Sequence, residues 1–177
     1  MKRLRVTVQE IICKDPQDPR YDELYFVVAT NNVSQVSSTI RRIGRGVTKP
    51  CEIIFDEMVD ERSPILITAL EQRAVKDNSK AVKVMEYLAA QGVEFADDWL
   101  KNNPSSLKNM WREIGDFLLT NLISLVKLIF RDSPLLNKVI TEPYKDDVTY
   151  PVIYVMKGKS DSRPTYDYEI KFTISYK

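Results

Sequence analysis

The chain opens with a regular alternation of apolar and polar residues. Leu4, Val6 and Val8 share one face, and the residues between them are charged or polar, which predicts a half-buried β-strand. Apolar runs rich in β-branched and aromatic residues predict further strands over residues 24–30, 33–40, 51–57 and 64–72. We therefore expect five strands before the pattern changes.

After residue 78 the apolar residues recur every three or four positions, the period of a helix. Val82, Met85 and Leu88 follow this spacing, and Gly92 is a suitable stop. Helices are predicted over residues 79–91, 93–101 and 107–130, with a short helical turn over residues 135–140.

Strand patterns return at residues 148–156 and 164–176, where tyrosine, isoleucine and phenylalanine alternate with polar residues. Because strands flank the helices on both sides, residues 79–140 are interpreted as a helical insert before the last two strands. The predicted fold is mainly β with α: one antiparallel β-sandwich domain, residues 1–177, that carries this insert.

Charge and composition exclude several classes of function. The 26 Lys and Arg residues nearly balance the 25 Asp and Glu residues, so no surplus of charge favours nucleic-acid binding. The complete lack of histidine excludes Ser-His-Asp and Cys-His nucleophiles and histidine-ligated metal sites. The basic N-terminus lacks the apolar core of a secretory signal, and no transmembrane helix is predicted, so we expect a soluble protein. The sequence favours the cytoplasm but leaves the compartment open.

Two cysteines, Cys13 and Cys51, allow one disulfide at most. We expect two buried thiols instead. Without histidine they also make a poor zinc site, because structural zinc usually has four Cys or His ligands.

The apolar segment 107–130 has two interpretations. Its stripes either pack on the sandwich as an auxiliary core or form a surface that binds a membrane or a protein partner. Residues 117–130 would span about 21 Å as a helix, less than the roughly 30 Å of a hydrocarbon core. The candidate contact residues are Trp111, Phe117, Leu118, Leu122 and Phe130.

Residues 3–73 resemble a known family. The alternating strand at Leu4–Val8 is followed by the acidic stretch CKDPQDPRYDELYFVV, and CEIIFDEMVDERSPILITALEQ resembles two adjacent strands joined by a short polar turn. Both stretches are similar to the C-two domain, the calcium- and phospholipid-binding β-sandwich of protein kinase C and synaptotagmin. The resemblance implies a sandwich whose tip loops bind ligands, and it places the helical insert at such a tip.

The resemblance also implies a calcium site, which would use Asp15, Asp22, Glu71 and Asp77. Arg73 lies among these prospective ligands and would oppose a cation. The simpler alternative is that the acids solvate a loop and form its turns, so that no cofactor is bound.

Two further clusters have candidate chemistry. The basic residues Arg41, Arg42, Arg45 and Lys49 surround two glycines, as in loops that accept a phosphate or carboxylate, and the alternative is a charged hairpin loop. The acids at 56, 57, 60 and 61 suggest either paired catalytic carboxylates or a solvated hairpin turn.

The sequence favours a non-enzymatic interaction module that binds a protein or a membrane surface through tip loops and the helical insert, and not a nucleic acid. Two alternatives remain. One is a membrane-active, pore-forming toxin-like protein that uses the apolar helix 107–130, and the other is a hydrolase that works through carboxylates alone.

Overall fold

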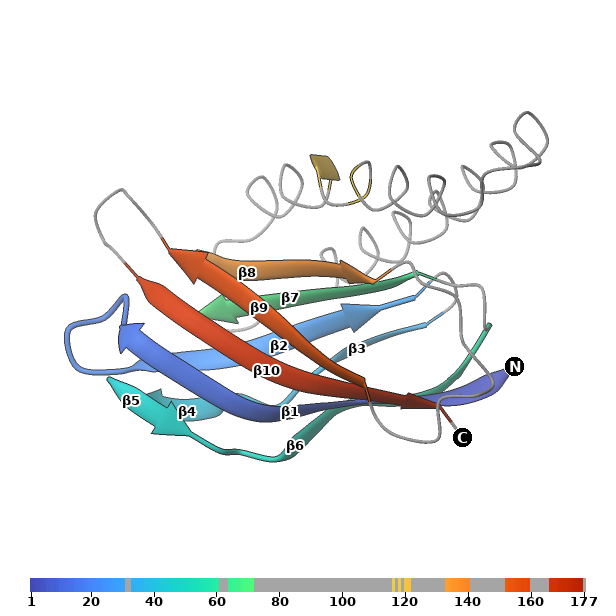
Figure 1. Ribbon diagram of the computed structural model, residues 1–177, viewed down its shortest axis with the longest axis horizontal. Helices are drawn as coiled ribbons and strands as arrows, with labels where there is room; N and C mark the ends of the chain where they lie inside the picture. Colours follow the sequence, from blue (N-terminus) through green and yellow to red (C-terminus); the bar gives the residue numbers. More distant parts are fainter. Residues whose placement is uncertain are drawn as a thin grey trace.

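Two antiparallel β-sheets face each other in the computed structural model (Figure 1). The structure describes residues 1–30, 33–60, 64–71, 116, 118, 120–121, 133–140, 152–159 and 166–176. Within these residues each sheet has five strands. This confirms the predicted mainly antiparallel β architecture.

Sheet A is organised around the long first strand, β1 (Lys2–Asp15). One edge of β1 pairs with β10 (Asp167–Tyr176), which in turn pairs with β9 (Val152–Lys159). The other edge pairs first with β6 (Glu52–Val59) and then with β5 (Gly46–Thr48).

Sheet B is organised around β2 (Asp22–Ala29) in the same way. One edge of β2 pairs with β7 (Ile65–Glu71), and β7 pairs with β8 (Ser133–Ile140). The other edge is shared by β3 (Ser34–Val36) and β4 (Ile40–Ile43).

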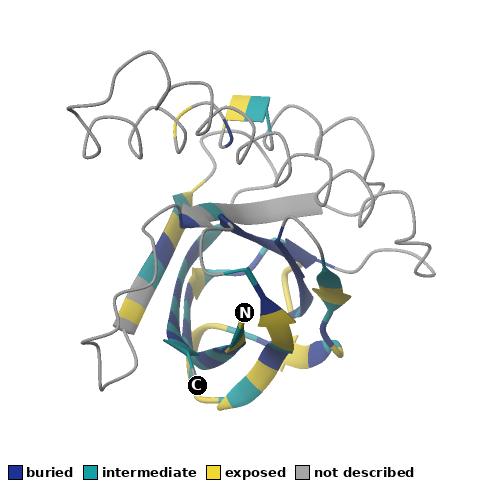
Figure 2. Ribbon diagram, turned by 90° about the vertical axis from the view of Figure 1, so that its right-hand side faces the viewer, coloured by how far each residue is buried: buried dark blue, intermediate teal, exposed yellow. Residues whose placement is uncertain are grey.

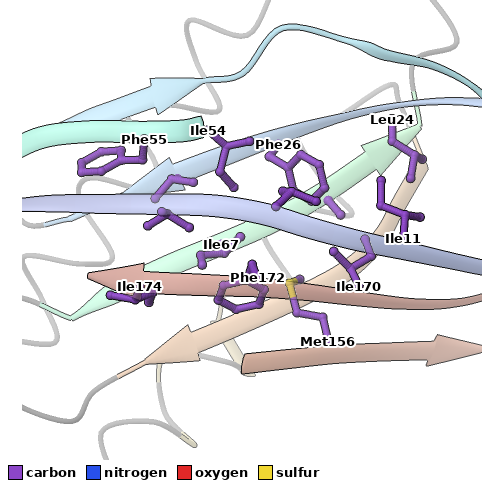
Figure 3. Packing of buried hydrophobic residues seen from close by; sticks show 14 of the residues in the cluster. Ile11, Leu24, Phe26, Ile54, Phe55, Ile67, Met156, Ile170, Phe172 and Ile174 are labelled. Carbon is purple, nitrogen blue, oxygen red and sulfur yellow. The ribbon is translucent and has the colours of Figure 1, made fainter. Parts of the chain in front are cut away.

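The core lies between the two sheets, and alternate residues of the strands fill it (Figure 3). In β1 these are the apolar residues of the opening alternation, and in β10 the buried residues also alternate with partly exposed ones. The labelled core side chains include Ile11, Phe26, Ile67 and Phe172, which come from both sheets.

The outer face of sheet B is buried as well. The residues of β2 and β7 that point away from the core are Tyr25, Val27, Leu66, Thr68 and Leu70, and each is 0% exposed. This explains why these strands are almost continuously apolar, since a strand that is covered on both faces loses the alternation of a half-buried one.

Besides strand β8, four residues of the predicted insert are described, and they are helical: Asp116, Leu118, Thr120 and Asn121. Figures 1 and 2 place them above sheet B, on the side away from sheet A. Leu118 is fully buried, whereas Asp116 and Thr120 are exposed. Most of the predicted helical segment lies outside the described residues, and the described part contains no helix that could cross a membrane.

The prediction for residues 135–140 was wrong, because they belong to strand β8 and not to a helical turn. Three strands therefore follow the described helical residues, not two. Pairing with β7 decides the conformation, and the register shifts between Ala69 and Leu70, where β8 contributes Pro134 and then Leu136. Such an irregularity is a typical place for proline in a sheet.

Three connections in the first half also differ from the prediction. Residues 33–40 form β3 and the start of β4, with Ser37 between them; the Ser37 hydroxyl accepts the Phe26 amide at 2.9 Å. The stretch 41–50, expected as a loop, contains the rest of β4 and all of β5. β4 and β5 lie in different sheets, as do β6 and β7, so neither connection is a hairpin.

Candidate functional site

The antiparallel pairing gathers several connections at one end of the sandwich, opposite the two termini (Figure 1). Here β1 ends and β2 begins, β4 leads into β5, and β9 ends near the start of β10. This part is called the basic end because of its described cations, which are Lys14, Arg20, Arg41, Arg42, Arg45, Lys157 and Lys159.

A buried carboxylate, that of Asp22, fixes the loop between β1 and β2. One of its oxygens accepts the Gln17 amide at 2.7 Å, and the other accepts the Asp18 amide at 2.7 Å. The Tyr168 hydroxyl, from the opposite sheet, donates a third hydrogen bond. Asp22 is 1% exposed, so these bonds offset the cost of burying its charge.

Tyr168 lies between this carboxylate and the Cys13 thiol. Burial and the hydrogen bond to Asp22 raise the pKa of Tyr168, which keeps its hydroxyl protonated as a donor. Burial also raises the pKa of Cys13, its register partner on β1, so this thiol is a poor nucleophile. The cluster is structural: it connects the two sheets and the loop.

The other cysteine differs from the prediction. Both thiols are free, but Cys51 is exposed, so only Cys13 is buried as expected. Cys51 has a φ of 48° and directly precedes β6. Its thiol donates to the Gln9 side chain at 3.8 Å.

The residues proposed for calcium do not form a cluster of ligands in the described part of the chain. Asp15 forms an ion pair with Arg45 at 2.8 Å, and Asp22 already accepts three hydrogen bonds. Glu71 is buried at the end of β7, and Asp77 lies outside the described residues. No group of three Cys, Asp or Glu residues suited to a metal occurs among the described residues.

The four residues proposed for anion binding separate into two groups. Arg45 is paired with Asp15, and the Lys49 ammonium lies 3.7 Å from a Glu10 oxygen. Arg41 and Arg42 are exposed on β4, and Arg42 has a φ of 61°. Gly44 lies next to the first loop: a Cβ atom there would be 3.4 Å from the Arg20 carbonyl oxygen, which is close to ordinary van der Waals contact.

The structure also forms an open depression of about 220 Å³ at the basic end. Its lining comes from the ends of β1 and β9 and the start of β10: Lys14, Lys157, Gly158, Lys159, Asp167, Tyr168 and Glu169. Sequence analysis missed this site because its lysines are far apart in the chain. Only the pairing of β1, β10 and β9 brings them together.

The charges in the depression are partly balanced. Lys157 forms an ion pair with Glu169 at 3.1 Å. Lys14 and Lys159 make no ion pair within the described part of the chain, and Asp167 is the register partner of Lys159. Among the described residues, two lysines and one carboxylate are therefore available to a ligand.

Asp56, from the acidic stretch considered for catalysis, is held by arginines on the outer face of sheet A. Arg3 and Arg5 each approach its carboxylate to 2.8 Å. These hydrogen bonds lower the pKa of Asp56, so it remains a charged ion-pair partner. On the same face, the hydrogen bond from Lys171 to Glu10, at 2.7 Å, lowers the pKa of Glu10.

The outer face of sheet A is open where that of sheet B is covered (Figure 2). It exposes several apolar side chains among the ion pairs, including Ile53 (49% exposed), Met58 (51%) and Ile153 (66%).

Of the residues proposed to contact a partner or membrane, only Leu118 is described, and it is buried. Trp111, Phe117, Leu122 and Phe130 lie outside the described residues.

Comparison with known proteins adds no identity: no family model matches the chain, and no curated protein sequence matches it.

Proposed function

We propose that this protein is a non-enzymatic interaction module that binds an anionic membrane surface through the basic end. The observation that carries this proposal is the gathering of cations by the fold. Seven lie at the basic end, and within the described residues five of them make no ion pair: Lys14, Arg20, Arg41, Arg42 and Lys159.

Cations without a carboxylate partner do not have to break an ion pair before they bind a lipid headgroup. Each Lys or Arg near an anionic bilayer contributes about 1 kcal/mol, so a few of them give measurable binding. The acids at this end reduce the attraction: Asp18, Glu23 and Asp167 lie at or near the surface, and Asp22 and Glu71 are buried, so the proposal depends on the exposed side chains of the five cations. The resemblance to phospholipid-binding sandwiches supports the same ligand class, although here no bridging calcium is needed.

Vesicle flotation tests the proposal directly. The protein is mixed in EDTA with vesicles of phosphatidylcholine alone or with added phosphatidylserine. We expect it to float only with the anionic vesicles and to be released by salt, which screens exposed charges beyond about 8 Å at physiological ionic strength. Calcium is expected to make no difference.

A matched pair of variants localises the binding. The triple variant Lys14→Gln, Arg20→Gln, Lys159→Gln should lose flotation, whereas Lys2→Gln, at the other end of β1, should retain it. Unchanged flotation of the triple variant would refute the basic end as the binding surface. A lack of flotation with every vesicle would refute the membrane proposal.

A protein partner is the second candidate, and it is favoured by a different observation. Ile53, Met58 and Ile153 are exposed among polar residues on the open face of sheet A, as in many transient interfaces. If the vesicle experiment fails, this face is the next surface to examine.

The two alternatives from the sequence have less support. A toxin-like helix would have to leave its packing, and Leu118, its one described apolar residue, is fully buried. A carboxylate hydrolase needs two convergent free acids, but Glu169 in the depression is tied to Lys157.

A further inference from the structure

We infer that the depression at the basic end binds a single phosphate group, held by Lys14 and Lys159. This inference rests on the proposed function and gives the same end a defined ligand chemistry. It distinguishes a recognised phosphate from a diffuse attraction to negative charge.

The shape of the depression follows from the strand register. Gly158 is the partner of Tyr168, whose side chain points into the sandwich. Lys157 and Lys159 alternate with Gly158 along β9, so they lie on the outer face together with their partners Glu169 and Asp167, and all of these residues border the same depression. The ring of Tyr168 cannot shift freely, since its hydroxyl is bonded to the buried Asp22 carboxylate.

The electrostatics favour an anion with a high charge. Lys157 forms an ion pair with Glu169. Lys14 and Lys159 are therefore the two lysines of the depression without an ion pair among the described residues. Tyr168 adds no negative charge, because it stays protonated. A phosphate monoester carries between one and two charges near neutral pH, its second pKa being about 6, so it can engage both ammonium groups.

Asp167 provides the sharpest test, because it borders the same depression with the opposite charge. Removal of a lysine should weaken phosphate binding, whereas removal of this carboxylate should strengthen it. A purely structural role for these residues would not produce effects of opposite sign on phosphate binding.

The experiment is an NMR titration of the isotope-labelled full chain with inorganic phosphate, compared with sodium chloride at equal ionic strength. We expect saturable shifts of the Lys14 and Gly158 amides with phosphate only. Lys14→Gln and Lys159→Gln should each weaken binding about two- to fivefold, and Asp167→Asn should tighten it by a similar factor. Lys2→Gln should leave it unchanged, and the spectra also report whether each variant is folded.

A lack of saturable shifts, or effects of the same sign for all three variants, would overturn the phosphate site. If flotation with phosphatidylserine still occurs, the membrane proposal survives that failure. Vesicles with phosphatidic acid or with phosphatidylglycerol identify the source: stronger flotation with the monoester indicates a lipid headgroup, and phosphate binding without this preference indicates a soluble ligand.

Discussion

At the scale of single residues, Asp22 has the clearest structural role. Its buried carboxylate joins the loop after β1 to Tyr168 in the opposite sheet. Asp22→Ala leaves two amides and a hydroxyl without their acceptor, so we expect the free energy of unfolding to fall by about 3 kcal/mol. Tyr168→Phe should cost about 1–2 kcal/mol. Urea denaturation measures both changes.

Asp18 provides the control for this prediction. It lies in the same loop, but it is exposed, and its carboxylate accepts only the Arg20 amide in the described structure. Asp18→Ala should therefore change stability by less than about 1 kcal/mol. Equal losses for Asp18 and Asp22 would show that the loop, and not the buried carboxylate, determines the effect.

The ion pairs of sheet A predict how stability depends on pH. Hydrogen bonds from Lys171 and Arg3 lower the pKa values of Glu10 and Asp56 below their ordinary 4.5 and 3.8. A carboxyl group with a lowered pKa stabilises the fold above its unfolded-state pKa, and this contribution is lost as the pH falls through the folded-state value.

The double variant Glu10→Gln, Asp56→Asn should therefore melt below the wild type at pH 7, and the difference in melting temperature should shrink as the pH falls below about 4. Glu57→Gln, on the same exposed stretch of β6, is the control and should melt close to the wild type at both pH values. A difference between the wild type and the double variant that does not depend on pH would contradict the assignment.

At the scale of elements, the two sheets differ in what their outer faces contact. Leu66, on the outer face of sheet B, is 0% exposed, whereas Ile153, on the outer face of sheet A, is 66% exposed. Leu66→Ala should cost about 3 kcal/mol, as in a core, because it leaves a cavity. Ile153→Ala should change stability by no more than about 0.5 kcal/mol. If both substitutions had small effects, sheet B would not be covered in solution.

The apolar and polar pattern of the sequence predicted those strands in which the pattern matches the burial of the two strand faces. β1 and β10 alternate because each has one face in the core, and β2 and β7 are continuously apolar because both faces are buried. β8 was missed because its pairing with β7, across a shift at Pro134, decides its conformation. The short strands β4 and β5 were missed for the same reason: they pair with strands distant in sequence.

At the scale of the whole molecule, the chain is nearly neutral, with 26 Lys and Arg residues against 25 Asp and Glu residues. A total charge says nothing about where the charges gather in the fold, so it did not predict the depression at the basic end. Lys14 and Lys159 lie more than a hundred residues apart, yet both line the same depression, because β10 pairs with β1 and β9 on its two edges. The predicted basic loop did reach this end, but the partners of Arg45 and Lys49 could not be read from local spacing.

This arrangement predicts the orientation of the protein on a membrane. At about 3.3 Å per residue, β1 places Lys14 about 33 Å from Leu4, several times the screening length of roughly 8 Å, so charges at the far end add little. In a Cys51→Ser background the only native cysteine is the buried Cys13. One fluorophore is then attached to a new cysteine, either Arg20→Cys at the basic end or, in a second protein, Glu57→Cys at the far end, where residue 57 pairs with Leu4. Quenchers in the headgroup region of anionic vesicles should quench the label at residue 20 strongly and the label at residue 57 weakly. Because replacing Arg20 removes one cation, flotation must first show that this protein still binds, and stronger quenching at residue 57 would mean that the opposite end contacts the membrane.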